Sequence, residues 1–264
     1  METLLRQKLA AYGIDTLAFL PFERCRVILP RRLPDHCRTA ALFLMPYHTG
    51  AYPERNVSLY AVPRDYHLFF KTLADDLGPA LVRAFPGDTF DFFCDSSPID
   101  EVSAAVDAGL GVRGRNGLLI HEKYGSYVFI GTILTSRTVT VKETEKAPRS
   151  CLGCGACERA CAYLAGKGGA CLSEMNQRKK LDPNELETVR AARVRWGCDV
   201  CQEVCPMNRN VPVTPIRFFH ESTLPVLTEE RLARMDDAAF SERAYAWRGR
   251  KTIARNIAEA DDAT

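Results

Sequence analysis

Eight of the eleven cysteines in this chain lie between Cys151 and Cys205. The first four follow the spacing C-x2-C-x2-C-x3-C, and the last three follow C-x2-C-x3-C-P, with Pro206 as the proline. This spacing is typical of ferredoxin-type segments, in which three closely spaced thiolates bind one 4Fe-4S cluster and a fourth reaches a second cluster. Two adjacent clusters imply electron transfer. The segment is therefore predicted to be an electron-transfer domain.

The cluster interpretation uses all eight cysteines when Cys171 supplies the thiolate that the second motif lacks. With the fourth ligands crossed, the first predicted set is Cys151, Cys154, Cys157 and Cys205. The second predicted set is Cys161, Cys171, Cys198 and Cys201. One or two zinc sites are the alternative, because zinc also binds C-x2-C pairs, but they leave Cys157, Cys161 and Cys205 unexplained. The cysteines outside the segment are predicted to be small buried residues, and they are Cys25, Cys37 and Cys94.

The composition is that of an ordinary globular protein, with 264 residues, 46% hydrophobic and 26% charged, and a net charge of +2. No long block of like charge occurs, which excludes a highly charged nucleic-acid-binding tail. The N-terminus lacks the apolar region of a signal peptide, and the apolar runs are far shorter than the roughly 20 residues that span a bilayer. We therefore predict a cytoplasmic protein with no membrane segment. In that reducing compartment, clustered cysteines bind metals more often than they form disulfides.

Residues 1–141 are predicted to form an α/β domain, because compact apolar runs alternate with segments of helical periodicity. Gly78 and Pro79 are expected to kink or divide one helix. The strand at 118–120 is expected to pair with the strand at 126–135. The predicted strands are 16–20, 39–45, 89–94, 118–120 and 126–135, and the predicted helices are 1–12, a helix from about residue 65, and 98–108.

Residues 142–264 are predicted to form a second domain. A polar stretch at 142–150, which contains Pro148, is the expected linker between the two domains. Short helices are expected around the cysteines. Longer helices are predicted at 184–196, after Thr228 and at 249–260.

Several motifs outside the cysteine segment resemble those of a known family. They are Arg64-Asp65-Tyr66-His67, Asp95-Ser96-Ser97-Pro98, AGLGVRGRNGLLI at 108–120 and YGSYVFIGTILT at 124–135. Together with GCDVCQEVCPMN at 197–208 and both cysteine motifs, their order and spacing resemble the epoxyqueuosine reductases over most of the chain. Members of that family use cobalamin and two 4Fe-4S clusters to complete queuosine in tRNA, and they are related to the reductive dehalogenases.

The resemblance implies a nitroreductase-like sheet with flanking helices that binds cobalamin, followed by a small ferredoxin-like domain with two clusters. It implies an oxidoreductase that reduces the epoxide of epoxyqueuosine to the alkene of queuosine, with Asp95 as the acid that protonates the departing oxygen. Phe90, Phe92 and Phe93 are expected to desolvate this carboxyl and raise its pKa. Without the resemblance, Asp95 is better interpreted as the N-cap of a helix that begins near Pro98.

The resemblance also implies a set of cobalamin contacts. Leu119 and Ile130 would contribute backbone groups, because their side chains offer no hydrogen bonds. The alternative for both side chains is simple packing in the core. The implied contacts are Arg26, Ser58, Leu119, Ile130, Ser173, Cys198 and Asp199.

The sequence departs from the family in three places. Only residues 21–25 separate the first strand from Arg26, where the family carries a longer segment that helps to cover the site. Val112 stands where the family often has an aromatic residue. The chain ends soon after the sequence TIARN at 252–256, so we expect a short form without the C-terminal helical-repeat extension. These departures leave the redox chemistry intact and weaken the assignment of a tRNA substrate.

The anticodon loop of tRNA remains the expected partner. Basic side chains that are available to neutralise phosphates are Arg178, Lys179, Lys180, Arg248, Arg250, Lys251 and Arg255. A solvated helix face is the alternative interpretation of these charges. We further expect a monomer that receives electrons from a small protein such as flavodoxin or ferredoxin. Two other functions stay open: a related cobalamin and iron-sulfur reductase of an organohalide or another epoxide, and a non-catalytic electron carrier.

Overall fold

The computed structural model describes residues 1–140, 150–166, 170–192 and 194–261. They form two compact units: residues 1–47, 69–154 and 206–217 make the first, and residues 48–68, 155–205 and 218–264 make the second. The expected linker at 142–150 lies outside the described residues, apart from Ser150. Residues 48–68 belong with the cysteine segment, and residues 206–217 belong with the N-terminal unit. The functional division after residue 141 therefore stays a prediction.

The first unit is built on a sheet of four antiparallel strands in the order β1-β2-β6-β3. The strands are β1 (Ala18–Pro21), β2 (Thr39–Pro46), β3 (Phe90–Cys94) and β6 (Val128–Thr135). Every residue of β2 is buried, as the continuous apolar run in the sequence predicts for a strand that is covered on both faces. The strands predicted at 39–45 and 89–94 are confirmed, and the fold is of mixed α and β type.

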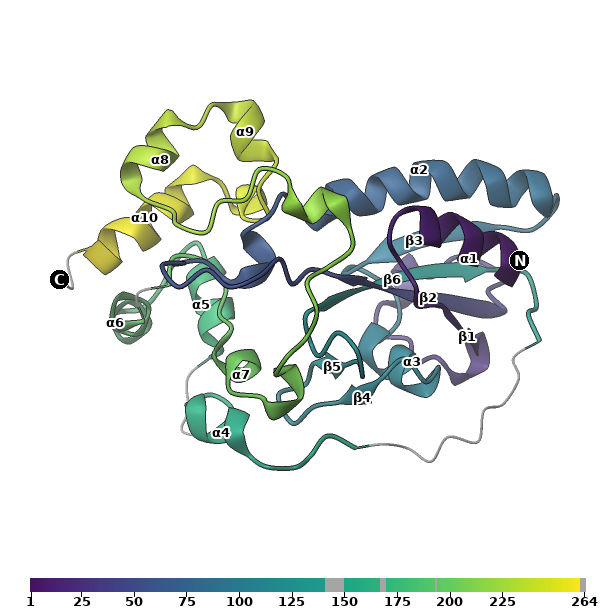
Figure 1. Ribbon diagram of the computed structural model, residues 1–264, viewed down its shortest axis with the longest axis horizontal. Helices are drawn as coiled ribbons and strands as arrows, with labels where there is room; N and C mark the ends of the chain where they lie inside the picture. Colours follow the sequence, from purple (N-terminus) through teal and green to yellow (C-terminus); the bar gives the residue numbers. More distant parts are fainter. Residues whose placement is uncertain (141–149, 167–169, 193, 262–264) are drawn as a thin grey trace. The chain divides into compact units, whose positions relative to one another are not determined.

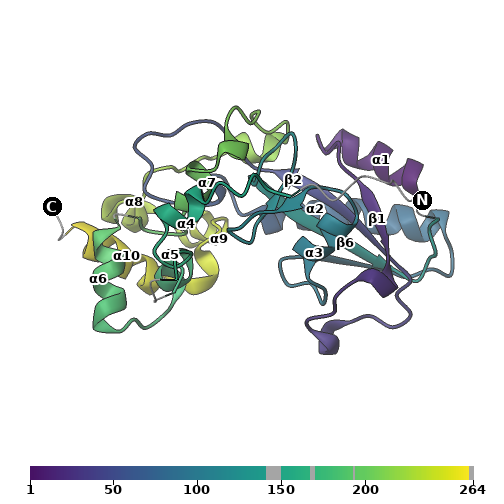
Figure 2. The same ribbon diagram turned by 90° about the horizontal axis from the view of Figure 1, so that it is seen from below.

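Helices cover both faces of this sheet (Figure 1). The helices α1 (Glu2–Ala11) and α2 (Tyr66–Ala84) lie on one face, where Phe43 of β2 stacks on Phe70 of α2 with 6.3 Å between the ring centroids. The helix α3 (Glu101–Asp107) lies across the other face, near β6 in Figure 2. There Ala104 and Ala105 of α3 share a core with alternate residues of β2 and β6. This alternation follows from the two-residue period of a strand.

The helix α2 continues through Pro79 for 19 residues, so it is not divided at this proline, and the kink expected as the alternative stays a prediction. Proline removes one main-chain hydrogen bond from a helix interior. The leucines Leu73, Leu77 and Leu81 recur at four-residue spacing and are at most 1% exposed. We infer that burial of this apolar stripe against the sheet holds the helix together across the missing hydrogen bond.

The strand pairing predicted for residues 118–120 is wrong. The strand β5 (Leu119–Ile120) pairs with β4 (Val112–Arg113) in a separate two-stranded sheet, and β6 pairs with β2 and β3. His121, the residue after β5, forms a β-bridge with Gly125 in the segment before β6. The turn that forms the β4–β5 hairpin contains Gly114 and Gly117, and Gly117 has a φ of +82°, which a side chain disfavours.

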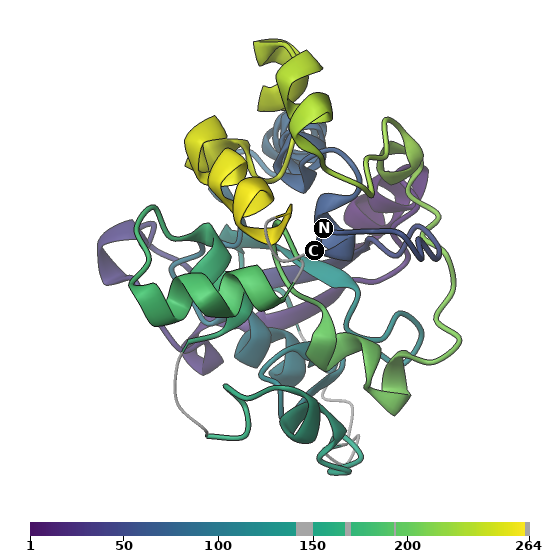
Figure 3. The same cartoon turned by 90° about the vertical axis from the view of Figure 1, so that its left-hand side faces the viewer.

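The second unit is made of short helices. They are α4 (Ala156–Ala160), α5 (Leu172–Gln177), α6 (Pro183–Ala191), α7 (Val200–Glu203), α8 (Glu229–Arg234), α9 (Asp237–Ser241) and α10 (Arg250–Asp261). Figure 3 shows α10 in yellow beside the green helices of the cysteine segment, and α10 contacts α5, α6 and α8. Trp196, Phe219 and Tyr245 are fully buried in this unit. The helices predicted after Thr228 and at 249–260 are confirmed, whereas the helix predicted at 184–196 ends at Ala191.

Short 3-10 helices connect the longer elements, at Phe22–Arg24, Pro30–Arg32, Leu59–Ala61, Pro206–Asn208, Arg217–His220 and Ala246–Arg248. Within the described part of the chain, no helix is long and apolar enough to cross a membrane.

Candidate active site and cluster segment

The turn after β3 presents Asp95 at one end of the sheet. Asp95 has a φ of +65°, which residues other than glycine rarely adopt. The residue before it, Cys94, is buried and pairs with Gly131 of β6, while Asp95 itself is exposed. A strained main chain of this kind persists where surrounding contacts hold it, and it is common at functional sites.

Glu101, in the first turn of α3, holds this turn. Its Oε2 accepts a hydrogen bond from the main-chain N–H of Asp95 at 3.1 Å, and its Oε1 accepts one from the hydroxyl of Thr132 on β6 at 2.8 Å. Desolvation raises the pKa of Glu101 to about 8; the hydrogen bond from Thr132 opposes this rise, and the nearby charge of Asp95 adds to it. The sequence predicts a desolvated acid at Asp95, and the structure places the desolvated acid at Glu101.

The N-cap of α3 is Asp100. Its side chain accepts hydrogen bonds from the N–H of Ser103 at 3.0 Å and from the Ser103 hydroxyl at 2.8 Å. The alternative interpretation of Asp95 as the helix cap is therefore wrong. Although burial alone would raise it, the pKa of Asp100 is held below its usual value by the bonds from Ser103 and by the nearby Arg113 and Arg26. Asp95 is left without the capping role that its position before Pro98 suggests.

Arg26 lies beside the same turn. Its main-chain carbonyl accepts a hydrogen bond from the N–H of Asp100 at 2.9 Å, and its guanidinium lies 3.8 Å from the Asp100 carboxylate. The side chain of Arg26 is 74% exposed. The adjacent Val27 forms a β-bridge with Ile99. The structure thus brings Arg26 and Asp95, two residues that the resemblance implies for the site, to one end of the sheet.

Ile130 and Leu119 lie in the core below this end of the sheet. Ile130 is 9% exposed and Leu119 is 3% exposed, and both belong to the apolar cluster that includes Ile99. Their side chains therefore pack in the core, so contact with a ligand is left to their backbone groups. Ile130 lies one residue beyond Gly131, where β3 ends, so β3 provides no strand partner for β6 at Ile130 among the described residues.

In the cysteine segment, three of the four predicted ligands of the second set influence one another electrostatically. Burial raises the pKa of the Cys198 thiol to about 11, and the neighbouring Cys171 and Cys161 add to this rise. Cys161, Cys171 and Cys198 come from different stretches of the chain, and the fold brings their charges within electrostatic reach of one another. In the first predicted set, Cys151 and Cys154 belong to the first unit, and Cys157 and Cys205 belong to the second. Among the described residues, no three His, Cys, Asp or Glu side chains are arranged to hold a single metal ion.

Two buried asparagines position the main chain that leads to Cys198. Asn176 of α5 bonds Gly197 twice, from its Nδ2 to the carbonyl at 2.7 Å and from the Gly197 N–H to its Oδ1 at 3.1 Å. Asn256 of α10 donates to the carbonyls of Asn176 and Arg195 at 2.7 and 2.8 Å. Both asparagines are fully buried. Asn256 ends the sequence TIARN, and these contacts give that motif a structural role.

Ser58 and Asp199, both implied cobalamin contacts, bond to each other. The Ser58 hydroxyl donates to Asp199 Oδ1 at 2.5 Å, and the N–H of Leu59 donates to Oδ2 at 2.6 Å. Arg55 pairs with the same carboxylate at 2.8 Å, and Gln202 donates to it at 3.1 Å. Asp199 is only 4% exposed, so its charge is compensated inside this network. The network fixes the turn at Cys198.

Ser173 lies in the first turn of α5, two residues after Cys171, and accepts a hydrogen bond from Gln177 at 3.2 Å. The sequence did not identify Glu101, Asn176 or the bonds that join Asp199 to Ser58, Arg55 and Gln202. The local signal for Glu101 was an acidic residue only six positions after Asp95, near the start of the predicted helix. The partners of Asp199 gave no local signal, because Ser58 lies 141 residues away in the sequence.

Comparison with known proteins adds to this geometry. No family model matches the chain. The epoxyqueuosine reductase of Listeria monocytogenes is 33% identical over 207 residues, which are 73% of this chain and 53% of that relative. The epoxyqueuosine reductase of Pseudomonas aeruginosa is 35% identical over 184 residues, 67% of this chain and 49% of that relative. The resemblance to the epoxyqueuosine reductases is confirmed.

Solved epoxyqueuosine reductases share the fold. The structure of the enzyme from Streptococcus thermophilus matches with a TM-score of 0.76 at 20% identity, over 100% of this chain and 81% of that chain. An epoxyqueuosine reductase crystallised with an epoxyqueuosine-modified tRNA stem loop matches with a TM-score of 0.76 at 21% identity, over 98% of this chain and 80% of that chain. The chain spans about half the length of the curated epoxyqueuosine reductases it matches.

Proposed function

We propose that this protein is an epoxyqueuosine reductase, an oxidoreductase that converts the epoxide of epoxyqueuosine in tRNA to the alkene of queuosine. The observation that carries the proposal is the sequence identity of 33% and 35% to two curated enzymes of that name, over 73% and 67% of the chain. The structure supports it with a turn that presents Asp95 at the end of the sheet, on a fold shared with solved enzymes of that name.

The reaction sets what the site must deliver. Reduction of an epoxide to an alkene breaks both carbon–oxygen bonds and releases the oxygen as water. Two electrons and two protons are therefore consumed for each substrate. The chain must provide an acid beside the departing oxygen and a path for electrons to the substrate carbon.

Asp95 is the proposed acid. Its exposed side chain can give a proton to the epoxide oxygen and take up another from solvent. Glu101 bonds the Asp95 main chain and fixes the position of the turn. With a pKa of about 8, Glu101 is largely uncharged at neutral pH, and it then adds little repulsion to an ionised Asp95.

Cobalamin, when bound, would supply the strongly reducing centre that passes both electrons to the substrate. In the first unit, the proposed contacts are Arg26 and the backbone groups of Leu119 and Ile130. The absence of a β3 partner for β6 at Ile130, within the described residues, fits a ligand held through main-chain groups. In the second unit, the proposed contacts are Ser58, Ser173, Cys198 and Asp199. Because the Ser58 and Asp199 side chains bond to each other, we assign their contact to the main chain of the turns they hold.

Two 4Fe-4S clusters are proposed to carry electrons through a ferredoxin-like segment. The neighbouring thiols of Cys161, Cys171 and Cys198 support the second ligand set, which Cys201 completes. Cys151, Cys154, Cys157 and Cys205 are the proposed ligands of the first cluster. The antiparallel sheet with helices on both faces supports the proposal of a nitroreductase-like cobalamin domain. We further propose a monomeric cytoplasmic enzyme, with flavodoxin or ferredoxin as its electron donor.

The decisive test uses the protein purified without oxygen and reconstituted with iron, sulfide and cobalamin. It is given a chemical reductant and a tRNA stem loop that contains epoxyqueuosine, and the nucleosides are then separated by mass spectrometry. We expect epoxyqueuosine to disappear as queuosine appears in equal amount. If both clusters and cobalamin are bound and no queuosine forms, the proposed function is wrong. Turnover of an organohalide or another epoxide by the same preparation would then identify a related reductase.

A further inference from the structure

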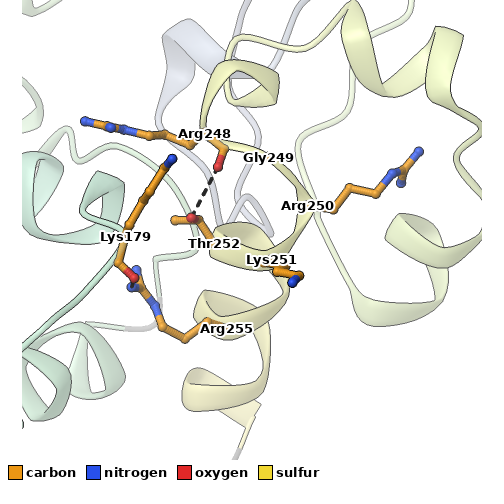
Figure 4. A pocket seen from close by; sticks show the side chains of 7 residues that line it. All are labelled: Lys179, Arg248, Gly249, Arg250, Lys251, Thr252 and Arg255. Carbon is orange, nitrogen blue, oxygen red and sulfur yellow. Dashed lines mark hydrogen bonds between the residues drawn. The ribbon is translucent and has the colours of Figure 1, made fainter.

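A cavity of about 380 Å³ in the second unit is lined almost entirely by cationic residues (Figure 4). Its lining residues are Lys179, Arg248, Gly249, Arg250, Lys251, Thr252 and Arg255. No acidic residue lines it. A space of this size holds about a dozen water molecules at the density of the liquid, which is ample for a phosphate group with part of its sugar.

Two of the arginines build the wall of the cavity. Arg250 donates to the carbonyls of Leu232 at 3.0 Å and Met235 at 2.6 Å. Arg255 donates to the carbonyls of Arg178 at 2.8 Å and Lys179 at 3.3 Å. Arg250 also pairs with the Asp237 carboxylate at 3.2 Å, which offsets its charge, but the lining carries four further cations: Lys179, Arg248, Lys251 and Arg255. The cavity therefore keeps a positive potential while these side chains fix its shape.

The other cations are placed to receive a ligand. Lys179 and Lys251 are exposed, and Figure 4 shows the Lys179 side chain extending towards Arg248. The Nε of Arg248 is buried and has no hydrogen-bond partner among the residues that the structure describes. The 12-residue helix α10 begins at Arg250, so its first main-chain N–H groups add positive potential at the cavity. Lysine, arginine and a helix N-terminus together are well suited to an anionic oxygen ligand such as phosphate.

An exposed tryptophan at the same place narrows the choice of ligand. Trp247 is 62% exposed, and the Arg248 guanidinium lies over its ring at 3.9 Å from the centroid. An exposed aromatic ring beside the cations would not contribute to the binding of a free phosphate or an acidic peptide. Unpaired bases of RNA stack on such rings while their phosphates contact neighbouring cations. The combination of a cationic cavity and an aromatic platform therefore favours single-stranded or looped RNA.

We propose that this cavity binds a phosphate of the tRNA stem loop through Arg248, Lys179 and Lys251, and that Trp247 stacks on an unpaired base of the same loop. This inference rests on the proposed function for its ligand, and it names the phosphate site and the stacking residue. In this proposal, Lys179 and Lys251 are binding residues that hold the substrate and take no part in the reaction.

The test measures binding of a fluorescent tRNA stem loop to the reconstituted protein. The double variant Lys179→Ala, Lys251→Ala should lose about tenfold or more in affinity, and the dependence of log K on log salt should fall by about one to two units. The matched control, Arg6→Ala with Lys71→Ala, removes two exposed cations from the first unit and should bind like the unchanged protein. In turnover, the cavity variant should raise KM and leave kcat unchanged, because uniform binding is lost.

The role of Trp247 is tested separately, through its fluorescence and through two variants. Stem-loop binding should quench the fluorescence of Trp247, and Trp247→Phe should remove this quenching while it keeps most of the affinity. Trp247→Ala should lose affinity, since it removes the stacking surface. Equal affinity of the cavity variant and the control would overturn the proposal, as would an absence of stem-loop binding by the unchanged protein. Failure of the proposed function would give a different result. The unchanged protein would then form no queuosine, while the cavity variant would still bind an unmodified stem loop weakly.

Discussion

Two carboxyl groups meet at the turn after β3, and their surroundings give them different tasks. Asp95 is exposed on a strained main chain, which suits an acid that must reach a substrate and regain its proton from water. Glu101 is desolvated and accepts hydrogen bonds from Thr132 and from the main chain of Asp95, which suits a residue that holds the turn. In the proposed mechanism, Asp95 transfers the proton and Glu101 supports the turn that carries it.

The first prediction concerns Asp95→Asn, which keeps the size of the side chain and removes its proton-donating carboxyl. We expect kcat for epoxide reduction to fall by about 10²- to 10⁴-fold, the range that general acid catalysis contributes. Iron content and bound cobalamin should not change. Asp35→Asn, an exposed change in the same unit, serves as the control and should keep full activity. Full activity of Asp95→Asn would refute the acid role.

The second prediction concerns Glu101→Gln and the pH dependence of stability. The pKa of Glu101 is about 8 in the folded protein and near its ordinary value of about 4.3 when unfolded. The folded state therefore keeps a proton that the unfolded state releases between these values, so stability falls as pH rises from about 5 to 8. The slope is at most about 1.4 kcal/mol per pH unit.

Thermal unfolding at pH 5.5 and 8.0 measures this effect. The melting temperature of Glu101→Gln should fall less between the two values than that of the unchanged protein, because glutamine does not titrate. Identical slopes would show that Glu101 is not protonated in the folded state. Glu101→Ala, which also loses the bond to the Asp95 main chain, should lower kcat while Glu101→Gln keeps most of it.

At the scale of residues, the sequence identifies side chains that can take part in chemistry, but it does not show which residues surround them in the fold. Asp95 could be singled out because its motif carries the resemblance, and the cysteines because their spacing is local. The surroundings of Glu101 could not be predicted, since they include Thr132, which lies 31 residues away on another strand. The same holds for Asp100, whose role as the cap of α3 depends on where the helix begins.

At the scale of elements, short helices are held in place by buried polar contacts. The helix α5 carries Asn176, which bonds both main-chain groups of Gly197 immediately before Cys198. Gly197 has a φ of +70°, and a Cβ there would clash with the side chain of Ser58. A glycine is therefore required at this point, and the asparagine keeps the glycine where the second cysteine motif needs it.

The third prediction is that Asn176→Ala loosens the second cluster. Removing the side chain leaves two buried main-chain groups of Gly197 without partners, at a cost of about 1–3 kcal/mol each. We expect a lower melting temperature and faster loss of iron in air than in the unchanged protein. Asn184→Ala, at an exposed position of α6, is the control and should behave like the unchanged protein. Equal rates of iron loss would contradict the role of Asn176.

Element prediction from the sequence succeeded where burial dominates. The strand β2 is apolar after Thr39 and buried throughout, so its bounds could be predicted within one residue. The strand β5 is two residues long, and its partner is chosen by the hairpin turn around Gly114 and Gly117, so periodicity could not identify it. At Pro79 the sequence suggested a break in the helix that α2 does not have, because the local effect of this proline is outweighed by the buried leucines of α2.

At the scale of the whole molecule, the proposed electron path requires two complete clusters. The fourth prediction is that the reconstituted protein binds about eight iron atoms per chain, as two cubane clusters require. Cys171→Ser should retain about four of them, because Cys171 belongs only to the second ligand set. Cys37→Ser, which changes a cysteine outside the segment, should retain all eight. Unchanged iron content in Cys171→Ser would remove this residue from the ligand set.

The two compact units are interleaved along the chain, which passes from one to the other after residues 47, 68, 154, 205 and 217. The last piece of the sheet unit, residues 206–217, includes Asn208, whose side chain bonds the main chain of Ser126 at 2.8 Å. On the ribosome, this piece emerges only after all eight cysteines of the cluster segment. The sheet unit therefore cannot finish folding before all eight of these cysteines have been synthesised.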